Sequence, residues 1–255
     1  MKRWLGIFLG LLFINSLVLL SPFSRNADAF KLFGKDEKGP RVIVVLVDMS
    51  GSTNRARRTV YNEAFEKIFE SLGQGDRIVV GTITSRSYID FKPVVDEEIP
   101  KDSIWVNRIQ YEQNLAKTQK NIHKEVNRLL SRKKGTPYTE ILNSLNIADT
   151  VFHNEKKRQK ILVILSDMVQ DSKEYKFDRV KVSNKYINNV IRQRQKQELI
   201  PDLSDVKIYV AGASATDSKK FRSIEKFWSR YFAATGADFS THRYGHSLIE
   251  FERDS

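Results

Sequence analysis

The residues best suited to chemistry are carboxylates and hydroxyls that follow apolar segments of the chain. One group, spaced D-x-S-x-S, stands directly after an apolar run at 42–47: Asp48, Ser50 and Ser52. Asp167 follows a second apolar run at 161–165, and Thr136 lies between the two in a loop that leads into a predicted helix. Oxygen ligands of this kind suit a hard divalent cation such as Mg²⁺, whereas zinc or copper favours histidine or cysteine.

Alternating strand and helix patterns position these residues. Wholly apolar or alternating segments predict strands at 42–47, 77–84, 161–165 and 206–211, with a short last strand within 238–251. Apolar residues at helical spacing predict helices around 61–72 and over about 108–133, 140–152, 178–198 and 217–234. This order predicts a doubly wound α/β fold with a mostly parallel central sheet flanked by helices. Ligands of such sheets bind outside the carboxyl ends of the strands, which is where the oxygen-bearing residues stand.

With these residues in this order, the sequence resembles the von Willebrand factor type A family over roughly residues 41–251. That family holds a cation in a metal-ion-dependent adhesion site, a D-x-S-x-S motif followed by a distant Thr and a distant Asp. The resemblance implies a site made of five residues here: Asp48, Ser50, Ser52, Thr136 and Asp167. It also implies Mg²⁺, or Mn²⁺ or Ca²⁺ in its place, with an open coordination position that accepts a carboxylate from a partner protein.

Two positions depart from the family pattern, and one alternative reading stays open. Met168 stands where the family often has Gly, so the loop after Asp167 is expected to differ. Thr139 competes with Thr136 for the metal role, and we favour Thr136 because it directly follows Gly135. As an alternative, the first helix could be capped by Ser50, Ser52, Thr53 or Asn54, and Asp167 could cap the next segment, a role that does not exclude metal binding.

The N-terminus reads as a secretory signal peptide. Lys2 and Arg3 precede an apolar run at 4–20, and Ala27-Asp28-Ala29 offers small residues where a signal peptidase cleaves. We therefore expect export to the periplasm or beyond the cell, with 1–29 as the signal segment, 30–40 as a linker and 41–252 as the folded domain. If the apolar segment is retained, it anchors the protein and brings it into contact with a membrane.

Composition narrows the classes of function. The chain of 255 residues has no cysteine, which excludes a disulfide framework, a zinc ribbon and a thiol nucleophile. Its formal charge of +12 becomes +10 once the charges of 1–29 are removed, so the exported part is itself basic. An acidic protein partner fits that charge, and no nucleic-acid motif accompanies it.

Two basic groups have a functional and a neutral reading. Arg55, Arg57 and Arg58 follow the D-x-S-x-S motif, where they either attract an acidic ligand or form a solvated helix face. The run R-Q-R-Q-K-Q at 192–197 either binds a polyanion or, as is more typical, is a solvent-facing charge run.

The sequence thus predicts a non-catalytic module that binds a protein through a cation. No G-x-S-x-G elbow, Walker-type loop or dinucleotide fingerprint is present, so we expect no enzyme activity. The alternative is a basic module that binds an anionic polymer or membrane lipid without the metal. Metal-dependent hydrolysis is a third hypothesis.

Overall fold

A central sheet is built around two strands whose side chains are apolar on both faces. The computed structural model describes residues 39–50, 54–86, 91–103, 107–132, 135–249 and 251. In the described part six strands form one sheet in the order β3-β2-β1-β4-β5-β6, parallel except for β3. Their bounds are β1 Arg41–Asp48, β2 Arg77–Ile83, β3 Val95–Glu98, β4 Gln159–Leu165, β5 Val206–Ala211 and β6 Asp238–Gly245.

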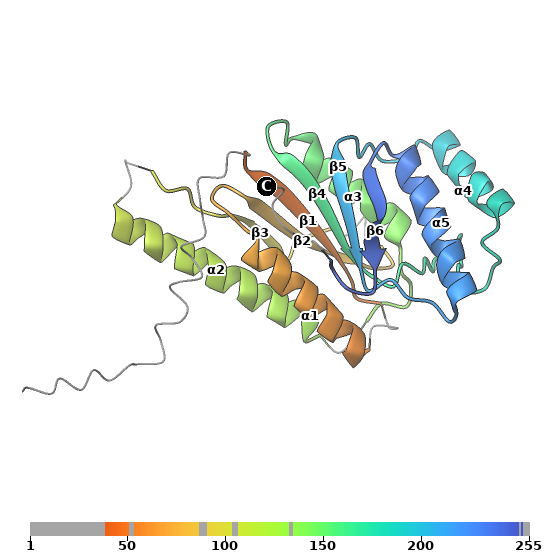
Figure 1. The fold of residues 1–255 in the computed structure, drawn as a ribbon, viewed down its shortest axis with the longest axis horizontal. Helices are drawn as coiled ribbons and strands as arrows, with labels where there is room; N and C mark the ends of the chain where they lie inside the picture. The colour runs from red at the N-terminus through yellow and green to blue at the C-terminus, as the bar shows by residue number, and fades with distance from the viewer. Residues whose placement is uncertain are drawn as a thin grey trace, which may run out of the picture. The chain divides into compact units, whose positions relative to one another are not determined.

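Helices cover both faces of this sheet (Figure 1). They are α1 Arg55–Glu70, α2 Arg108–Leu130, α3 Ile141–His153, α4 Asn184–Lys196 and α5 Ser218–Ala234. Alternate residues of β1 serve two separate cores, because successive side chains of a strand point to opposite faces. Ile43 and Val45 pack with α1 and α2, while Val44 and Leu46 pack with α3, α4 and α5. Burial on both faces explains the unbroken apolar run of this strand.

The predicted fold class is confirmed, and most predicted elements lie within a few residues of the observed ones. The strand β3 is the exception, since no strand was predicted there. Its residues read V-D-E-E, a segment with no apolar run and with one buried residue, Val95. It pairs antiparallel with β2 at the edge of the sheet, where Arg77 of β2 meets Asp96 at 2.8 Å. Charge pairing across the strands adds to the burial of Val95, the apolar residue of β3.

The fourth helix begins later than predicted. It starts at Asn184 instead of near 178, with Ser183 as N-cap accepting a hydrogen bond from the amide of Tyr186. The preceding segment carries Phe177 into the core, where its ring packs against Phe227 with a centroid distance of 4.5 Å. Phe177 lies in a turn ahead of the helix, and this turn places its ring in the core.

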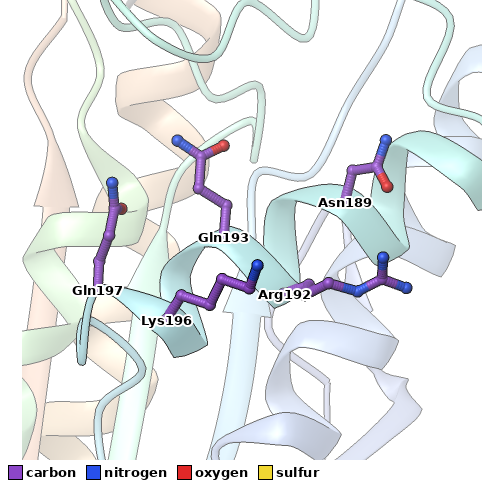
Figure 2. Close-up of a pocket in the computed structure, with 5 residues that line it drawn as sticks. All are labelled: Asn189, Arg192, Gln193, Lys196 and Gln197. Atoms are coloured by element: carbon purple, nitrogen blue, oxygen red, sulfur yellow. The ribbon is translucent and has the colours of Figure 1, made fainter.

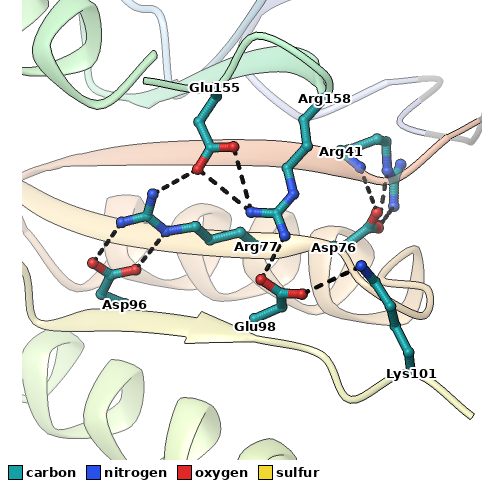
Figure 3. A network of polar contacts seen from close by, with 8 residues as sticks. All are labelled: Arg41, Asp76, Arg77, Asp96, Glu98, Lys101, Glu155 and Arg158. Carbon is teal, nitrogen blue, oxygen red and sulfur yellow. Dashed lines mark hydrogen bonds and ion pairs between the residues drawn. The ribbon is translucent and has the colours of Figure 1, made fainter. Parts of the chain in front are cut away.

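The amino ends of the strands carry a network of ion pairs (Figure 3). Buried Arg41 bonds Asp76 through its backbone amide at 2.7 Å and through its guanidinium at 2.7 and 3.0 Å. Arg77 forms a two-bond contact with Asp96 and reaches Glu155 at 2.7 Å. This edge is closed by pairs of opposite charge.

The predicted signal segment and most of the predicted linker lie outside the described residues, so both stay predictions. The described residues belong to one compact unit, Lys38–Ser255. Among them, no helix combines the length and apolar character needed to cross a membrane.

Candidate metal centre

The site lies at the point where the order of the strands reverses. From β1 the chain proceeds outward to β2 and β3, and after α3 it returns to β4 on the other side of β1. Such a reversal leaves a crevice between the carboxyl ends of the two central strands, which is the usual ligand site of doubly wound sheets. Asp48 is the last residue of β1, and Asp167 follows the end of β4.

Asp48 is fully buried, and both carboxylate oxygens accept hydrogen bonds. Oδ1 accepts from the amide of Ser50 at 2.8 Å, and Oδ2 accepts from the hydroxyl of Ser166 at 2.9 Å. Burial raises the pKa of Asp48, while these hydrogen bonds and the charge of Arg57 oppose that rise. The fold therefore fixes the position of this carboxylate, and burial makes its ionised form less favourable.

Asp167 is nearly as buried and contacts a cationic side chain. Its Oδ2 lies 3.0 Å from Nη1 of Arg57, and its Oδ1 accepts from the amide of Val169 at 2.9 Å. Burial raises the pKa of Asp167 to about 6 against the lowering effect of Arg57, and the charge of Asp48 raises it further. The negative charge of Asp48 thus acts on Asp167 at the switch point.

The loop that carries Thr136 joins the same edge. Ser50 and Thr136 form a parallel bridge, and the amide of Thr136 donates to the carbonyl of Met49 at 3.1 Å. The hydroxyl of Thr136 donates to the carbonyl of Tyr138 at 2.9 Å. Because its proton is used there, the lone pairs of this oxygen remain available to a cation.

Thr139 has a different place. Its backbone exchanges two hydrogen bonds with Asp171, at 2.8 and 3.1 Å, and the residue is buried. The bridge between Ser50 and Thr136 therefore favours Thr136 as the loop's ligand. Ser52 lies outside the described residues, so its role stays a prediction.

Capping of the first helix falls to Asn54, one of the predicted candidates. Asn54 is the N-cap of α1, and its side chain accepts from the amide of Arg57 at 2.9 Å. The amide of Ser50 donates to Asp48 Oδ1. The alternative that Ser50 serves only as a cap loses its main support.

Met168 shows why glycine suits the position after the second aspartate. Its φ is 64°, in the left-handed region that costs a non-glycine residue about 1–2 kcal/mol. The conformation is held by the amide of Met168, which donates to Ser166 Oγ at 3.0 Å, and by its carbonyl, which accepts from Trp228 Nε1 at 2.8 Å. Met168 is fully buried, so this loop packs an apolar side chain at that position.

Sequence reasoning missed the contacts of two residues. Ser166 positions Asp48, and Arg57 pairs with Asp167. A signal for Arg57 was present, since the first turn of α1 contains three arginines and no acidic residue. Cations are unfavourable at the positive end of a helix dipole, so such a cluster indicates an anion nearby.

These residues fit a hard divalent cation. The donor atoms are carboxylate and hydroxyl oxygens, and two buried carboxylates share a single contacting guanidinium. The buried hydroxyl of Tyr61 has no hydrogen-bond partner in the described part. Burial raises the pKa of Tyr61 most, and the charges of Asp48 and Asp167 add to that rise. An unsatisfied buried polar atom beside two carboxylates is expected where solvent or an ion completes a site. In the described residues no three His, Cys, Asp or Glu side chains cluster, so the hydroxyls are needed to complete the ligand set.

The basic run at 192–197 divides between core and surface. Arg194 is buried, donating to Tyr231 Oη at 2.9 Å, Asn143 Oδ1 at 3.1 Å and the carbonyl of Leu199 at 2.9 Å. Its reading as a solvent-facing residue is therefore wrong. The other face of α4 is exposed and borders a shallow hollow (Figure 2), lined by Asn189, Arg192, Gln193, Lys196 and Gln197. No strand-end residue contributes to that hollow.

No protein-family model and no curated protein matches this chain. Among solved structures it is similar to a manganese-loaded TRAP protein of Plasmodium vivax, with 15% identity over 72% of this chain and a TM-score of 0.40. It is also similar to a von Willebrand factor type A protein from Catenulispora acidiphila, with 13% identity over 78% of this chain and a TM-score of 0.39. A third is the pilus adhesin SpaC from Lactobacillus rhamnosus GG, with 15% identity over 83% of this chain and a TM-score of 0.44.

The chain spans 62% of the length of the first of these proteins, 43% of the second and 29% of the third. The second belongs to the family that the D-x-S-x-S motif indicated. At these identities the likeness is one of fold.

Proposed function

We propose that this chain is an exported, non-catalytic module that binds a protein partner through a divalent cation at the β1–β4 edge. The observation that carries the proposal is the placement of Asp48, Ser50, Thr136 and Asp167 at the switch point of the sheet. With Ser52 they would hold Mg²⁺, Mn²⁺ or Ca²⁺. The ion would supply a positive centre with an open position for a carboxylate of the partner.

The chain's own residues hold the donors in fixed geometry. Asp48 is held by Ser50 and Ser166, and the bridge between Ser50 and Thr136 brings the second loop to the first. Preorganised donors lose little entropy when the ion arrives, which favours binding. Export rests on the predicted signal segment, and membrane anchoring follows if that segment is retained.

A pull-down in Mg²⁺ followed by elution with a chelator tests the proposal. The partner should elute with chelator, and Asp48→Ala should abolish its capture. Asp178→Ala is a matched control, since Asp178 is exposed and pairs only with its neighbour Arg179 among the described residues. Full capture by the Asp48 variant would contradict the proposal.

A second candidate is a basic surface that binds an anionic polymer or lipid without the metal. The helix α4 favours it, because the segment contains no acidic residue and exposes Lys185, Arg192 and Lys196. In the described part none of these three forms an ion pair. Binding by this surface should weaken steeply with salt and ignore chelator. Titrating both agents against one binding signal separates the two candidates.

A further inference from the structure

Arg57 sets the charge of the candidate metal centre. It lies in the first turn of α1, where its Nη1 is 3.0 Å from Asp167 Oδ2 and its Nη2 is 3.4 Å from Ser214 Oγ. Its side chain is 18% exposed, so solvent screens it only in part. The pairing places a fixed positive charge against one of the two carboxylates proposed to hold the cation.

The formal charges of the two aspartates and of Arg57 can be added directly. Asp48 and Asp167 contribute two negative charges and Arg57 one positive charge, which leaves a net charge of −1. A bound divalent cation turns this into +1. Without the arginine, the loaded site would be neutral.

We propose that Arg57 makes this centre weaker for the cation alone and stronger for an anionic ligand once the cation is bound. This role of Arg57 rests on the function proposed above, and it explains why the site selects a carboxylate of the partner. The positive charge of Arg57 offsets the negative charge of Asp167 and so weakens the attraction of the cation. Once the cation is bound, the same positive charge attracts the anionic ligand. Binding of cation and anion becomes cooperative, and the coupling is reciprocal.

The neighbouring arginines have other roles, which makes them controls. Arg55 is exposed and forms no ion pair in the described part of the chain, and Arg58 donates through Nη1 to the carbonyl of Leu130 at 2.7 Å. Only Arg57 of the three contacts a proposed metal residue among the described contacts. Arg55→Gln therefore removes the same formal charge from the same helix turn without touching the site.

Mn²⁺ is the first probe, measured by isothermal titration in chloride buffer. Arg57→Gln should bind Mn²⁺ about tenfold more tightly than the wild type, within the usual range of coupling between sites. Arg57→Lys keeps the charge and should resemble the wild type, as should Arg55→Gln. Thermal unfolding of each variant shows whether the fold is retained.

Acetate is the second probe and stands for the carboxylate of a partner. Replacing chloride with acetate at equal ionic strength should tighten Mn²⁺ binding in the wild type and do so about fivefold less in Arg57→Gln. A result in which Arg57→Gln binds Mn²⁺ no more tightly than the wild type overturns the inference. Equal tightening by Arg55→Gln overturns it too, because the effect would then be general charge.

Asp48→Ala separates this inference from the function on which it rests. If that variant loses Mn²⁺ while Arg57→Gln stays at the wild-type affinity, the cation site stands and only the role of Arg57 fails. If Asp48→Ala binds Mn²⁺ as the wild type does, both the site and the inference fail. Binding by Arg57→Gln where the wild type binds none supports the role of Arg57.

Discussion

Buried carboxylates have different partners at the two ends of the central strands. At the amino end, Asp76 is held by the backbone amide and the guanidinium of Arg41 and by the amide of Gly73. At the carboxyl end, Arg57 pairs with Asp167, while Asp48 accepts hydrogen bonds from Ser50 and Ser166. One edge balances its charge within the chain, and the other retains excess negative charge.

The contrast separates structure from function. Loss of either partner of a buried ion pair is costly, because the remaining charge stays buried without compensation. Burial and the charge of Asp48 both raise the pKa of Asp167, so the ionised pair opposes folding unless a cation joins it. The amino edge is therefore expected to contribute to stability, and the carboxyl edge to binding.

Breaking the amino edge should give the largest effect. Asp76→Asn leaves the guanidinium of Arg41 buried without its counter-charge, and loss of one partner of a buried pair costs about 3–5 kcal/mol. Urea denaturation should show this fall in the free energy of unfolding, with Mg²⁺ affinity unchanged in the protein that remains folded. Asp96→Asn, at a half-exposed pair of the same network, is the control and should cost about 1 kcal/mol or less. Similar losses in both variants would contradict the distinction.

Adding a cation at the carboxyl edge should raise the free energy of unfolding, by slightly less than Asp76→Asn lowers it. Mg²⁺ at about one hundred times its dissociation constant should stabilise the folded state by about 2.7 kcal/mol. Thermal unfolding with Mg²⁺, compared with a monovalent salt at equal ionic strength, measures the gain. Asp48→Ala should show none. An equal gain in that variant would place the ion elsewhere.

The sequence predicted the parts of this comparison that depend on local pattern. The strands β1 and β4 are apolar on both faces because both faces are covered, and that pattern is visible along the chain. Chain order then places Asp48 and Asp167 after neighbouring strands. The candidate ligands could be chosen for that reason before any contact was known.

The parts that depend on distant pairings could not be predicted. Arg57 and Arg194 each belong to a run of basic residues that looks solvent-facing, yet one pairs with Asp167 and the other lies in the core. Nothing in the local pattern says which arginine of a run meets an acceptor from another element. The strand β3 was missed for a related reason, since Arg77 supplies part of what holds it.

Neutralising one carboxylate of the carboxyl edge should stabilise the metal-free protein. The folded-state pKa of Asp167, about 6, lies above the ordinary value of 3.8, so the native state keeps a proton that the unfolded chain has already lost. Its ionisation therefore lowers stability as the pH rises from about 4 to about 6. Asp167→Asn should gain about 2 kcal/mol at pH 7, after allowance for the lost pairing with Arg57, and the gain should vanish below about pH 4.

Denaturation of the wild type and Asp167→Asn in chelator at a series of pH values measures that gain. Asp178→Asn, at an exposed position, should show no such pH dependence. A constant difference between the wild type and Asp167→Asn at all pH values would show that ionisation is not its source. In Mg²⁺ the order should reverse, because the amide is a poorer ligand than the carboxylate.

The smallest effect should come from the residue that only orients a ligand. Ser166→Ala removes the hydroxyl that donates to Asp48 Oδ2 and accepts from the amide of Met168. Loss of such an outer partner typically lowers metal affinity about tenfold, or about 1.4 kcal/mol. Titration with Mn²⁺ should show this loss, and Ser166→Thr should restore most of the affinity because it keeps the hydroxyl. Ser144→Ala is the matched control, since that buried hydroxyl donates to the carbonyl of Ile141 within α3. Equal loss of Mn²⁺ affinity in both alanine variants would mean that general loosening of the core, rather than the orientation of Asp48, controls the carboxyl edge.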